Sequence, residues 1–391
     1  VDGLRTENTA GLSSTCVMAL RSLDPAAVKL DPNVIQLLVR ALREPWCRPR
    51  DLSAAAGVIL LRSAAMTRCV ERISHAEPAR LAELFTQSDL AALRNDGLLE
   101  ALLGTSPVTT VEVERVLIAI RRALLNEIAS GTLDADEAWL PLAAALGQQG
   151  FINEYVFDVT EDETAQLDRL RDEVAGAIAR NEAAVPIKLA VLASYLPLHS
   201  IFGAEQLAAR SWPDAVTLLV AQQVADHRDE QAIRSGIERL TAIEDDVSEK
   251  VRAQYEENPY PRWSRIFAET QPLPADHYIG MRFPGAPYKP IGNRALDVLV
   301  AGCGTGQHAI QRALQFRSAN ILAIDLSLSS LSYAIRKSKE LGLTNLRYAQ
   351  ADILALEGDR AFDVIDSSGV LHHLKDPLTG WRRLAGLVRP G

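Results

Sequence analysis

Three glycines at alternate positions follow a predicted strand, and their arrangement could bind a small molecule. The strand is expected over 296–301, and Gly302, Gly304 and Gly306 follow it in the run AGCGTGQ. Glycine allows a turn to bring bare backbone into contact with a ligand. A helix that begins near Thr305 would direct its free N–H groups and its positive end into the same crevice. The turn therefore predicts a site for a ligand that carries a carboxylate or a phosphate.

Two aspartates end the strands predicted after the glycine turn. Asp325 lies 19 residues beyond Gly306, where a carboxylate can accept both hydroxyls of a ribose lying across the strand ends. Asp352 ends the next strand, and an acceptor there suits the exocyclic amine of adenine, with Ile353 against the ring face. Ligands of parallel sheets bind at the carboxyl edge, so the turn and both carboxylates are expected to converge there.

The glycine spacing separates two classes of nucleotide-like ligand. A dinucleotide-binding turn has the pattern GxGxxG/A, whose last small residue lets the helix pack on the strand. That position is Gln307 here, a poor fit, and the observed pattern is GxGxG. A nicotinamide-dependent oxidoreductase is therefore the weaker alternative, although Asp325 alone would suit either class.

The elements that position these residues alternate between strands and helices. Four short apolar runs are predicted as strands, at 296–301, 320–324, 345–350 and 362–366, with amphipathic helices between them. Near-continuous apolar strands separated by helices indicate a parallel sheet covered on both faces. Right-handed crossovers then make the sheet doubly wound and Rossmann-like.

The runs AGCGTGQ, AIDLS, QADI and FDVIDSSGVLHHLKDP together resemble the core motifs of class I S-adenosylmethionine-dependent methyltransferases. The resemblance covers roughly the last 100 residues and implies S-adenosyl-L-methionine as the cofactor and methyl transfer as the activity. It implies a cofactor site made of Gly302, Cys303, Gly304, Gly306 and Gln307 at the methionine part, Asp325 and Leu326 at the ribose, Asp352 and Ile353 at the adenine, and Ser368 and Gly369 beside the transferring methyl.

One position departs from the pattern of these methyltransferases. Many relatives have an acidic residue two positions before the first glycine, where this sequence has Val300. Asp297 lies at the wrong place in the strand to substitute for it. Backbone carbonyls or water must then hold the amino group of the methionine part.

Two histidines follow the fourth predicted strand and are candidate catalytic residues. His372 or His373 could accept the proton that a nitrogen or oxygen nucleophile loses on methylation. The alternative is that one or both only pack or hydrogen-bond within the loop. His308 is expected to face solvent or the neighbouring strand. The methyl acceptor is predicted to be a small molecule or a protein.

Residues 1–250 are predicted to form an all-helical domain, because apolar residues recur at helical spacing almost throughout. An irregular bundle and a helical-repeat platform that binds a protein partner both remain possible. Arg121 and Arg122 are expected on a solvated helix face. This part also resembles bacterial proteins that join a helical, often tetratricopeptide-bearing, region to a methyltransferase. A non-catalytic scaffold that keeps a methyltransferase-like domain is therefore the second alternative.

Residues 251–290 are predicted to be an ordered connecting or lid segment. Its prolines exclude a helix or a central strand through most of its length, and its aromatic residues are unlike a flexible linker. We expect Tyr255, Tyr260, Arg262 and Trp263 to form either a lid over the cofactor or acceptor pocket or a structural clasp between the domains. The predicted fold is thus α + α/β, with the methyltransferase domain at 291–391 and incomplete at its C-terminus, since no strand follows 362–366.

Composition and charge restrict the partners. The net charge is −9. The excess of acidic residues lies outside the last domain, because 291–391 holds 12 Lys/Arg against 9 Asp/Glu. An acidic chain argues against binding a phosphate backbone, so no nucleic acid is expected. The four cysteines show no metal-ligand spacing and no apolar run spans a membrane. We predict no metal, no membrane partner and a cytoplasmic location.

Overall fold

The computed structural model divides the chain into two compact units. The helical unit comprises residues 1–227 and 263–267, and the sheet unit comprises residues 228–262 and 268–391. The residues that the structure describes are 15–22, 31–74, 85, 87–133, 137–182, 185–266, 274–285, 287, 290–292, 294–316, 318–358 and 361–390.

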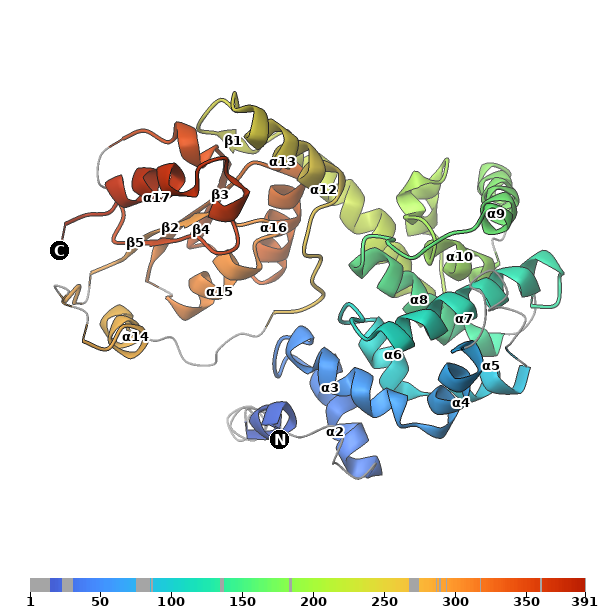
Figure 1. The fold of residues 1–391 in the computed structure, drawn as a ribbon. Coiled ribbons are helices and arrows are strands. Elements are labelled where there is room, and N and C mark those ends of the chain that lie inside the picture. The colour runs from blue at the N-terminus through green and yellow to red at the C-terminus, as the bar shows by residue number, and fades with distance from the viewer. Residues whose placement is uncertain are drawn as a thin grey trace, which may run out of the picture. The chain divides into compact units, whose positions relative to one another are not determined.

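The helical unit consists of helices that pack around one apolar core (Figure 1). Its α-helices are α2 (Pro32–Arg43), α3 (Arg50–Leu61), α4 (Ala64–Ile73), α5 (Gln87–Arg94), α6 (Gly97–Leu103), α7 (Val111–Ala129), α8 (Leu140–Ile152), α9 (Glu161–Ala179), α10 (Pro186–Ala193) and α11 (Asp214–Val220). None of the helices described is by itself long and apolar enough to cross a membrane, and the bent pair α3 and α4 meets that test only jointly.

Local sequence signals explain where these helices begin. Thr160 and Glu163 form the capping box at the start of α9, in which the Thr160 hydroxyl accepts from the Glu163 N–H and the Glu163 carboxylate accepts from the Thr160 N–H. Such reciprocal capping satisfies two N–H groups that the first helical turn leaves without partners. The spacing of Thr160 and Glu163 in the run TEDE is the sequence signal for such a cap.

The prediction for Arg121 and Arg122 is wrong, because both side chains are buried in the helical unit. Arg122 Nε donates to Glu163 Oε2 at 2.9 Å, and Tyr195 donates its hydroxyl to Glu163 Oε1 at 2.8 Å. The Arg121 guanidinium lies 4.0 Å from the Tyr195 ring centroid and donates to the Asp158 carbonyl oxygen at 2.6 Å. Two guanidinium groups can be buried here because a carboxylate, a carbonyl and an aromatic face surround them.

Glu163 is the centre of this buried cluster, and its ionised form stabilises the helical unit. Burial alone would raise the pKa of Glu163, but hydrogen bonds from the Thr160 N–H, Tyr195 and Arg122 lower it below its usual value. A carboxyl whose pKa is lowered by folding adds stability above its unfolded pKa of about 4.5 and loses it as the pH falls further.

We therefore predict that Glu163→Gln lowers the free energy of unfolding by about 3 kcal/mol at pH 7, because two buried arginines lose their carboxylate. The difference from wild type should shrink as the pH falls from about 4.5 toward the lowered pKa of folded Glu163, because the unfolded wild-type chain then binds a proton that the folded chain does not. Urea unfolding followed by tryptophan fluorescence measures this, since four of the five tryptophans belong to the helical unit.

The matched control is Glu173→Gln, which removes a carboxylate that is 55% exposed and pairs with Lys188. An exposed pair of this kind contributes at most about 1 kcal/mol. An equal effect of the two substitutions, or a Glu163→Gln effect that does not change with pH, would contradict the prediction.

The sheet unit contains a parallel five-stranded sheet in the order β1-β4-β3-β2-β5 (Figure 1). The strands are β1 (Glu238–Arg239), β2 (Asp297–Ala301), β3 (Asn320–Asp325), β4 (Leu346–Gln350) and β5 (Val364–Asp366). The four strands predicted from the sequence are present within one or two residues of their expected ends. The fold is the predicted one, a largely helical region followed by a Rossmann-like sheet.

Helices cover both faces of this sheet. Helices α15 (Gln307–Gln315) and α16 (Leu328–Glu340) pack on one face. Helix α17 (Pro377–Gly386) packs on the other, where Leu384 joins the inward side chains of the strands. The apolar runs of β2 and β3 are buried because each of their two sides faces a helix layer.

The chain that precedes β2 adds elements that the hydrophobic pattern did not reveal. Residues of α12 (Asp226–Arg234) and α13 (Asp246–Glu257) lie in the sheet unit, and β1 between them pairs with β4 at the edge of the sheet. A two-residue strand is too short to show the alternation by which strands are recognised. Helix α14 (Ala275–Arg282) also precedes β2.

Candidate functional site

The glycine turn leaves β2 with three left-handed residues. Gly302, Gly304 and Gly306 have φ of +73°, +52° and +82°, a region that side chains with a Cβ enter only at a cost. The N–H groups of Gly302 and Cys303 both donate to the Ile324 carbonyl oxygen, at 2.8 and 2.9 Å. The turn is thereby fixed to the end of β3, and α15 starts immediately after it at Gln307.

The three glycines face different neighbours. A Cβ on Gly302 would lie 2.3 Å from a methyl of Val370, and one on Gly306 would lie 2.5 Å from the Ala334 Cβ. These two positions therefore need glycine for internal packing. The sequence alone suggested a different reason, namely that a ligand approaches the backbone there. A Cβ on Gly304 would meet only the Tyr260 carbonyl oxygen, at 3.4 Å.

Asp325 lies at the carboxyl end of β3 and holds the glycine turn in place. Its Oδ2 accepts from the Gly304 N–H at 2.7 Å, and its Oδ1 accepts from the Ser327 N–H at 3.0 Å. Burial raises the pKa of Asp325 above its usual value, although these N–H groups partly oppose the shift. A carboxylate offers about four acceptor positions, so Asp325 retains capacity for ligand hydroxyls.

The residues predicted for the adenine lie at the end of β4. Asp352 is buried, its Oδ1 accepts from the Leu354 N–H at 2.9 Å, and its own N–H donates to Thr241 Oγ1 at 2.8 Å. Ile353 is buried beside it. Leu326 follows Asp325, and its carbonyl oxygen accepts from Gln350 Nε2 at 2.8 Å. The structure thus brings these residues to one edge of the sheet, and their contacts with a cofactor stay a prediction.

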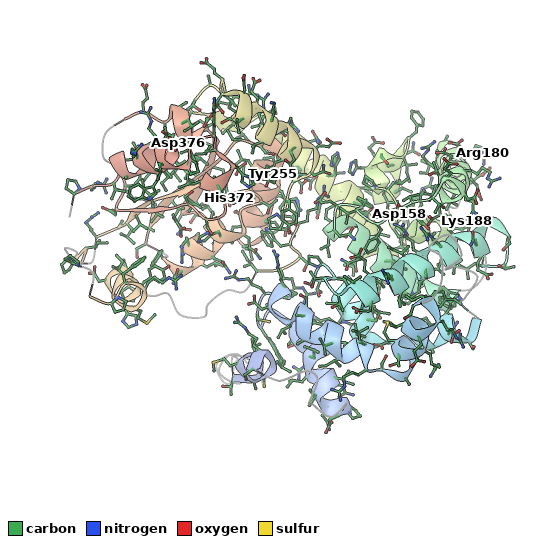
Figure 2. The ribbon with its side chains drawn as sticks, viewed as in Figure 1. Asp158, Arg180, Lys188, Tyr255, His372 and Asp376 are labelled. Atoms are coloured by element: carbon green, nitrogen blue, oxygen red, sulfur yellow. The ribbon has the colours of Figure 1, made fainter. Side chains whose placement is uncertain are left out.

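The loop after β5 holds the remaining predicted residues. Ser368 and Gly369 are exposed, and so are His372 and His373, whose ring centroids lie 4.1 Å apart. The His373 and Tyr255 rings are arranged edge to face, with their centroids 6.3 Å apart. Figure 2 labels Tyr255 and His372 in the sheet unit. An exposed imidazole at this edge is accessible to an acceptor, and the catalytic role of both histidines stays a prediction.

A segment that precedes β2 contacts the loops after β2, β3 and β5, and we call residues 255–261 the strap. The Tyr255 carbonyl oxygen accepts from Ser327 Oγ at 2.9 Å, and the Pro261 carbonyl oxygen accepts from Thr305 Oγ1 at 2.6 Å. Glu256 accepts from the N–H groups of Leu328 and Ser329, at 2.9 and 3.0 Å, and so caps α16.

The sequence reasoning missed the role of Glu256 because its capping partners lie more than 70 residues away. It placed Tyr255 and Tyr260 in a lid together with Trp263. In the structure residues 255–262 belong to the sheet unit, whereas Trp263 belongs to the helical unit.

A second group that was not identified from the sequence surrounds Asp366, the last residue of β5. Asp366 Oδ2 accepts from Arg312 Nε at 2.9 Å and lies 2.9 Å from His308 Nε2. Burial alone would raise the pKa of Asp366, but the hydrogen bonds and charges of His308 and Arg312 lower it. The i, i+4 spacing of His308 and Arg312 on α15 was the available signal, because it places them on one helix face.

Comparison with known proteins finds a family model that matches part of the sheet unit. A protein-family model described as a methyltransferase domain matches residues 298–391. The chain is 32% identical over 171 residues to an uncharacterized protein of Synechococcus sp., covering 40% of this chain and 38% of that protein.

Two further relatives are named enzymes. The chain is 30% identical over 131 residues to a ubiquinone biosynthesis O-methyltransferase of Xanthomonas axonopodis pv. citri, covering 33% of this chain and 53% of that protein. It is 37% identical over 95 residues to a trans-aconitate 2-methyltransferase of Deinococcus radiodurans, covering 24% and 34%. The chain thus spans between 34% and 53% of the length of the three relatives.

The packing of the glycine turn leads to a prediction for alanine substitutions. Gly302→Ala and Gly306→Ala should each destabilise the sheet unit more than Gly342→Ala, although all three glycines have positive φ. A Cβ on Gly342 meets open space and costs only the backbone strain, about 1–2 kcal/mol. At the two turn positions the overlap adds about 1–3 kcal/mol more.

Thermal unfolding of the three variants measures the difference. Gly342→Ala is the control, because it shares the effect of positive φ. The additional loss of stability in Gly302→Ala and Gly306→Ala then reports the packing against Val370 and Ala334. Equal melting temperatures for the three variants would refute this account of the turn.

Proposed function

We propose that this chain, whose residues 298–391 form a class I S-adenosylmethionine-dependent methyltransferase domain, binds S-adenosyl-L-methionine and transfers its methyl group to an acceptor. The observation that carries the proposal is the position of Asp325 at the end of β3, hydrogen-bonded to the backbone of Gly304. A carboxylate at this edge suits the two hydroxyls of a ribose.

The residues present fit this cofactor. Asp325 retains acceptor positions beyond its backbone partners. Gly304 carries no side chain and has only one backbone atom near its Cβ position. The first turn of α15 adds N–H groups and a positive end, which favour the carboxylate of a methionine part. A dinucleotide is disfavoured, because Gln307 occupies the position where its turn needs a small residue.

When bound, the cofactor supplies a methyl group on a sulfonium, which a nucleophile displaces in line. The chain's own residues act by alignment, because such a displacement needs orientation more than covalent help. His372 and His373 are exposed on the loop after β5 and are suited to accept the proton of the acceptor's nucleophile. Ser368 and Gly369 precede them and form the wall nearest to the acceptor.

The acceptor we propose is an oxygen or nitrogen nucleophile on a small molecule or a protein. The O-methyltransferase among the relatives supports an oxygen nucleophile as the first to test. The acidic charge of the chain outside 291–391 disfavours nucleic acid.

The cofactor assignment predicts that S-adenosylhomocysteine, the product of the cofactor, binds and that NAD does not. Asp325→Asn should weaken S-adenosylhomocysteine at least about tenfold, because hydrogen bonds to a charged acceptor contribute about 1.5–3 kcal/mol. Isothermal titration calorimetry measures both ligands. The control is Asp376→Asn, which alters a carboxylate that also accepts from a backbone N–H, in the cap of α17. The cofactor assignment would be refuted if the wild-type protein bound NAD and did not bind S-adenosylhomocysteine.

The proposed proton acceptor gives a separate prediction. If His372 or His373 is the general base, its replacement by Ala should lower the rate of methyl transfer about 10²–10⁴-fold, the usual contribution of such a group. The affinity for S-adenosylhomocysteine should stay unchanged. A tritiated-methyl assay on a lysate separated into protein, nucleic acid and small molecules identifies the acceptor class first. Unchanged turnover in both single variants and the double variant would exclude the histidines.

A further inference from the structure

The methionine part of the proposed cofactor carries an ammonium group, which needs a hydrogen-bond acceptor on the protein. An acidic side chain two positions before the first glycine would accept it, but that position is Val300, which is buried in β2. The nearest acid in the strand, Asp297, lies at the other end of β2. There it accepts from Arg389 at 2.9 Å and from Asn320 Nδ2 at 3.2 Å. No side-chain carboxylate of β2 can therefore serve.

A backbone oxygen of the strap lies at the glycine turn. The Tyr260 carbonyl oxygen is 3.4 Å from the position of a Cβ on Gly304, the glycine whose bare face meets nothing else. Among the residues that the structure describes, no hydrogen bond reaches this oxygen. The following carbonyl, that of Pro261, is already engaged by Thr305 Oγ1. Tyr260 thus presents a backbone acceptor beside Gly304 in the turn.

Three contacts fix the strap at this place independently of a ligand. Thr305 Oγ1 donates to the Pro261 carbonyl, one residue beyond the acceptor. Ser327 Oγ donates to the Tyr255 carbonyl at the ribose side. The carboxylate of Glu256 caps α16 and pairs with Arg234 at 3.0 Å. An acceptor held in this way loses little freedom on binding, which favours affinity.

We propose that the Tyr260 carbonyl oxygen accepts a hydrogen bond from the methionine ammonium of bound S-adenosylmethionine, in place of the side-chain carboxylate that Val300 lacks. The inference rests on the proposed function. It assigns the strap to the cofactor site, with Thr305 as a positioning residue that acts through the Pro261 carbonyl.

The experiment compares two variants with three ligands by calorimetry. Thr305→Val removes the hydroxyl that anchors Pro261 and keeps the shape of the side chain, whereas Thr305→Ser keeps the hydroxyl. The ligands are S-adenosylhomocysteine, the analogue in which hydrogen replaces its α-amino group, and 5′-methylthioadenosine, which lacks the whole amino-acid part.

Wild type should bind S-adenosylhomocysteine more tightly than the deaminated analogue. Thr305→Val should weaken S-adenosylhomocysteine about fivefold, the effect of one hydrogen bond of about 1 kcal/mol. The deaminated analogue and 5′-methylthioadenosine should bind Thr305→Val as they bind wild type, because neither carries the ammonium. Thr305→Ser should match wild type with all three ligands.

Equal affinity of wild type for S-adenosylhomocysteine and its deaminated analogue would overturn the inference, and this comparison needs no variant to fold. Equal weakening of all three ligands by Thr305→Val would also overturn it, because the strap would then act on the whole site. Failure of the proposed function looks different, since wild type would then bind none of the three ligands.

Discussion

The hydrogen bond from the Gly304 N–H to Asp325 is the contact on which the rest of the site depends. It joins the turn after β2 to the end of β3. The other oxygen of Asp325 accepts from Ser327, whose hydroxyl in turn donates to the Tyr255 carbonyl of the strap. The strap returns to the turn through Pro261 and Thr305. A closed ring of hydrogen bonds therefore connects three segments that are far apart in the sequence, and moving one of them strains the others.

The same ring places two backbone donors on the buried Asp325, with which no cation in the described part of the chain pairs. Burial raises the pKa of Asp325, so ionising it costs stability at neutral pH, and the backbone N–H groups only partly offset this cost. Glu256, which adds to the rise, has its own charge balanced by Arg234 and by the N-terminus of α16. A ligand that brings hydroxyls to Asp325 supplies donors that the protein lacks. Binding energy is thus available at a carboxylate whose ionised form the fold stabilises only in part.

Sequence reasoning succeeded where structure is local and failed where partners are distant. The strands of the sheet unit and the capping box at Thr160 follow from periodicity and from residues three apart, which the sequence displays directly. Arg121 and Arg122 were misassigned because a charged pair on a helix looks solvated unless one knows that Glu163 and Tyr195 lie against it. Such partners come from distant parts of the chain and leave no spacing signal.

The candidate site shows the same division. The turn, Asp325 and Asp352 end predicted strands, so the topology alone brings them to one edge. The strap was recognised as an ordered segment from its prolines and aromatic residues, but its contacts with Thr305 and Ser327 depend on a path through space that no local rule describes. The pairing of His308 with Asp366 was missed for the same reason, since it joins α15 to β5.

Two aspartates of the sheet, Asp363 before β5 and Asp325 at the end of β3, are held in opposite ways. At the amino ends, Asp363 accepts from Arg294 and Arg389 and from the Asp297 N–H. Burial alone would raise the pKa of Asp363, but these donors hold it well below its usual range. Asp363 therefore stabilises the fold above the ordinary carboxyl pKa and loses this effect only in stronger acid. At the carboxyl end of β3, Asp325 accepts from backbone donors, no cation of the described residues pairs with it, and its pKa moves the other way. Because ion pairs hold Asp363 and Asp366, the sheet can keep at Asp325 one carboxylate whose hydrogen-bonding capacity is left for a ligand.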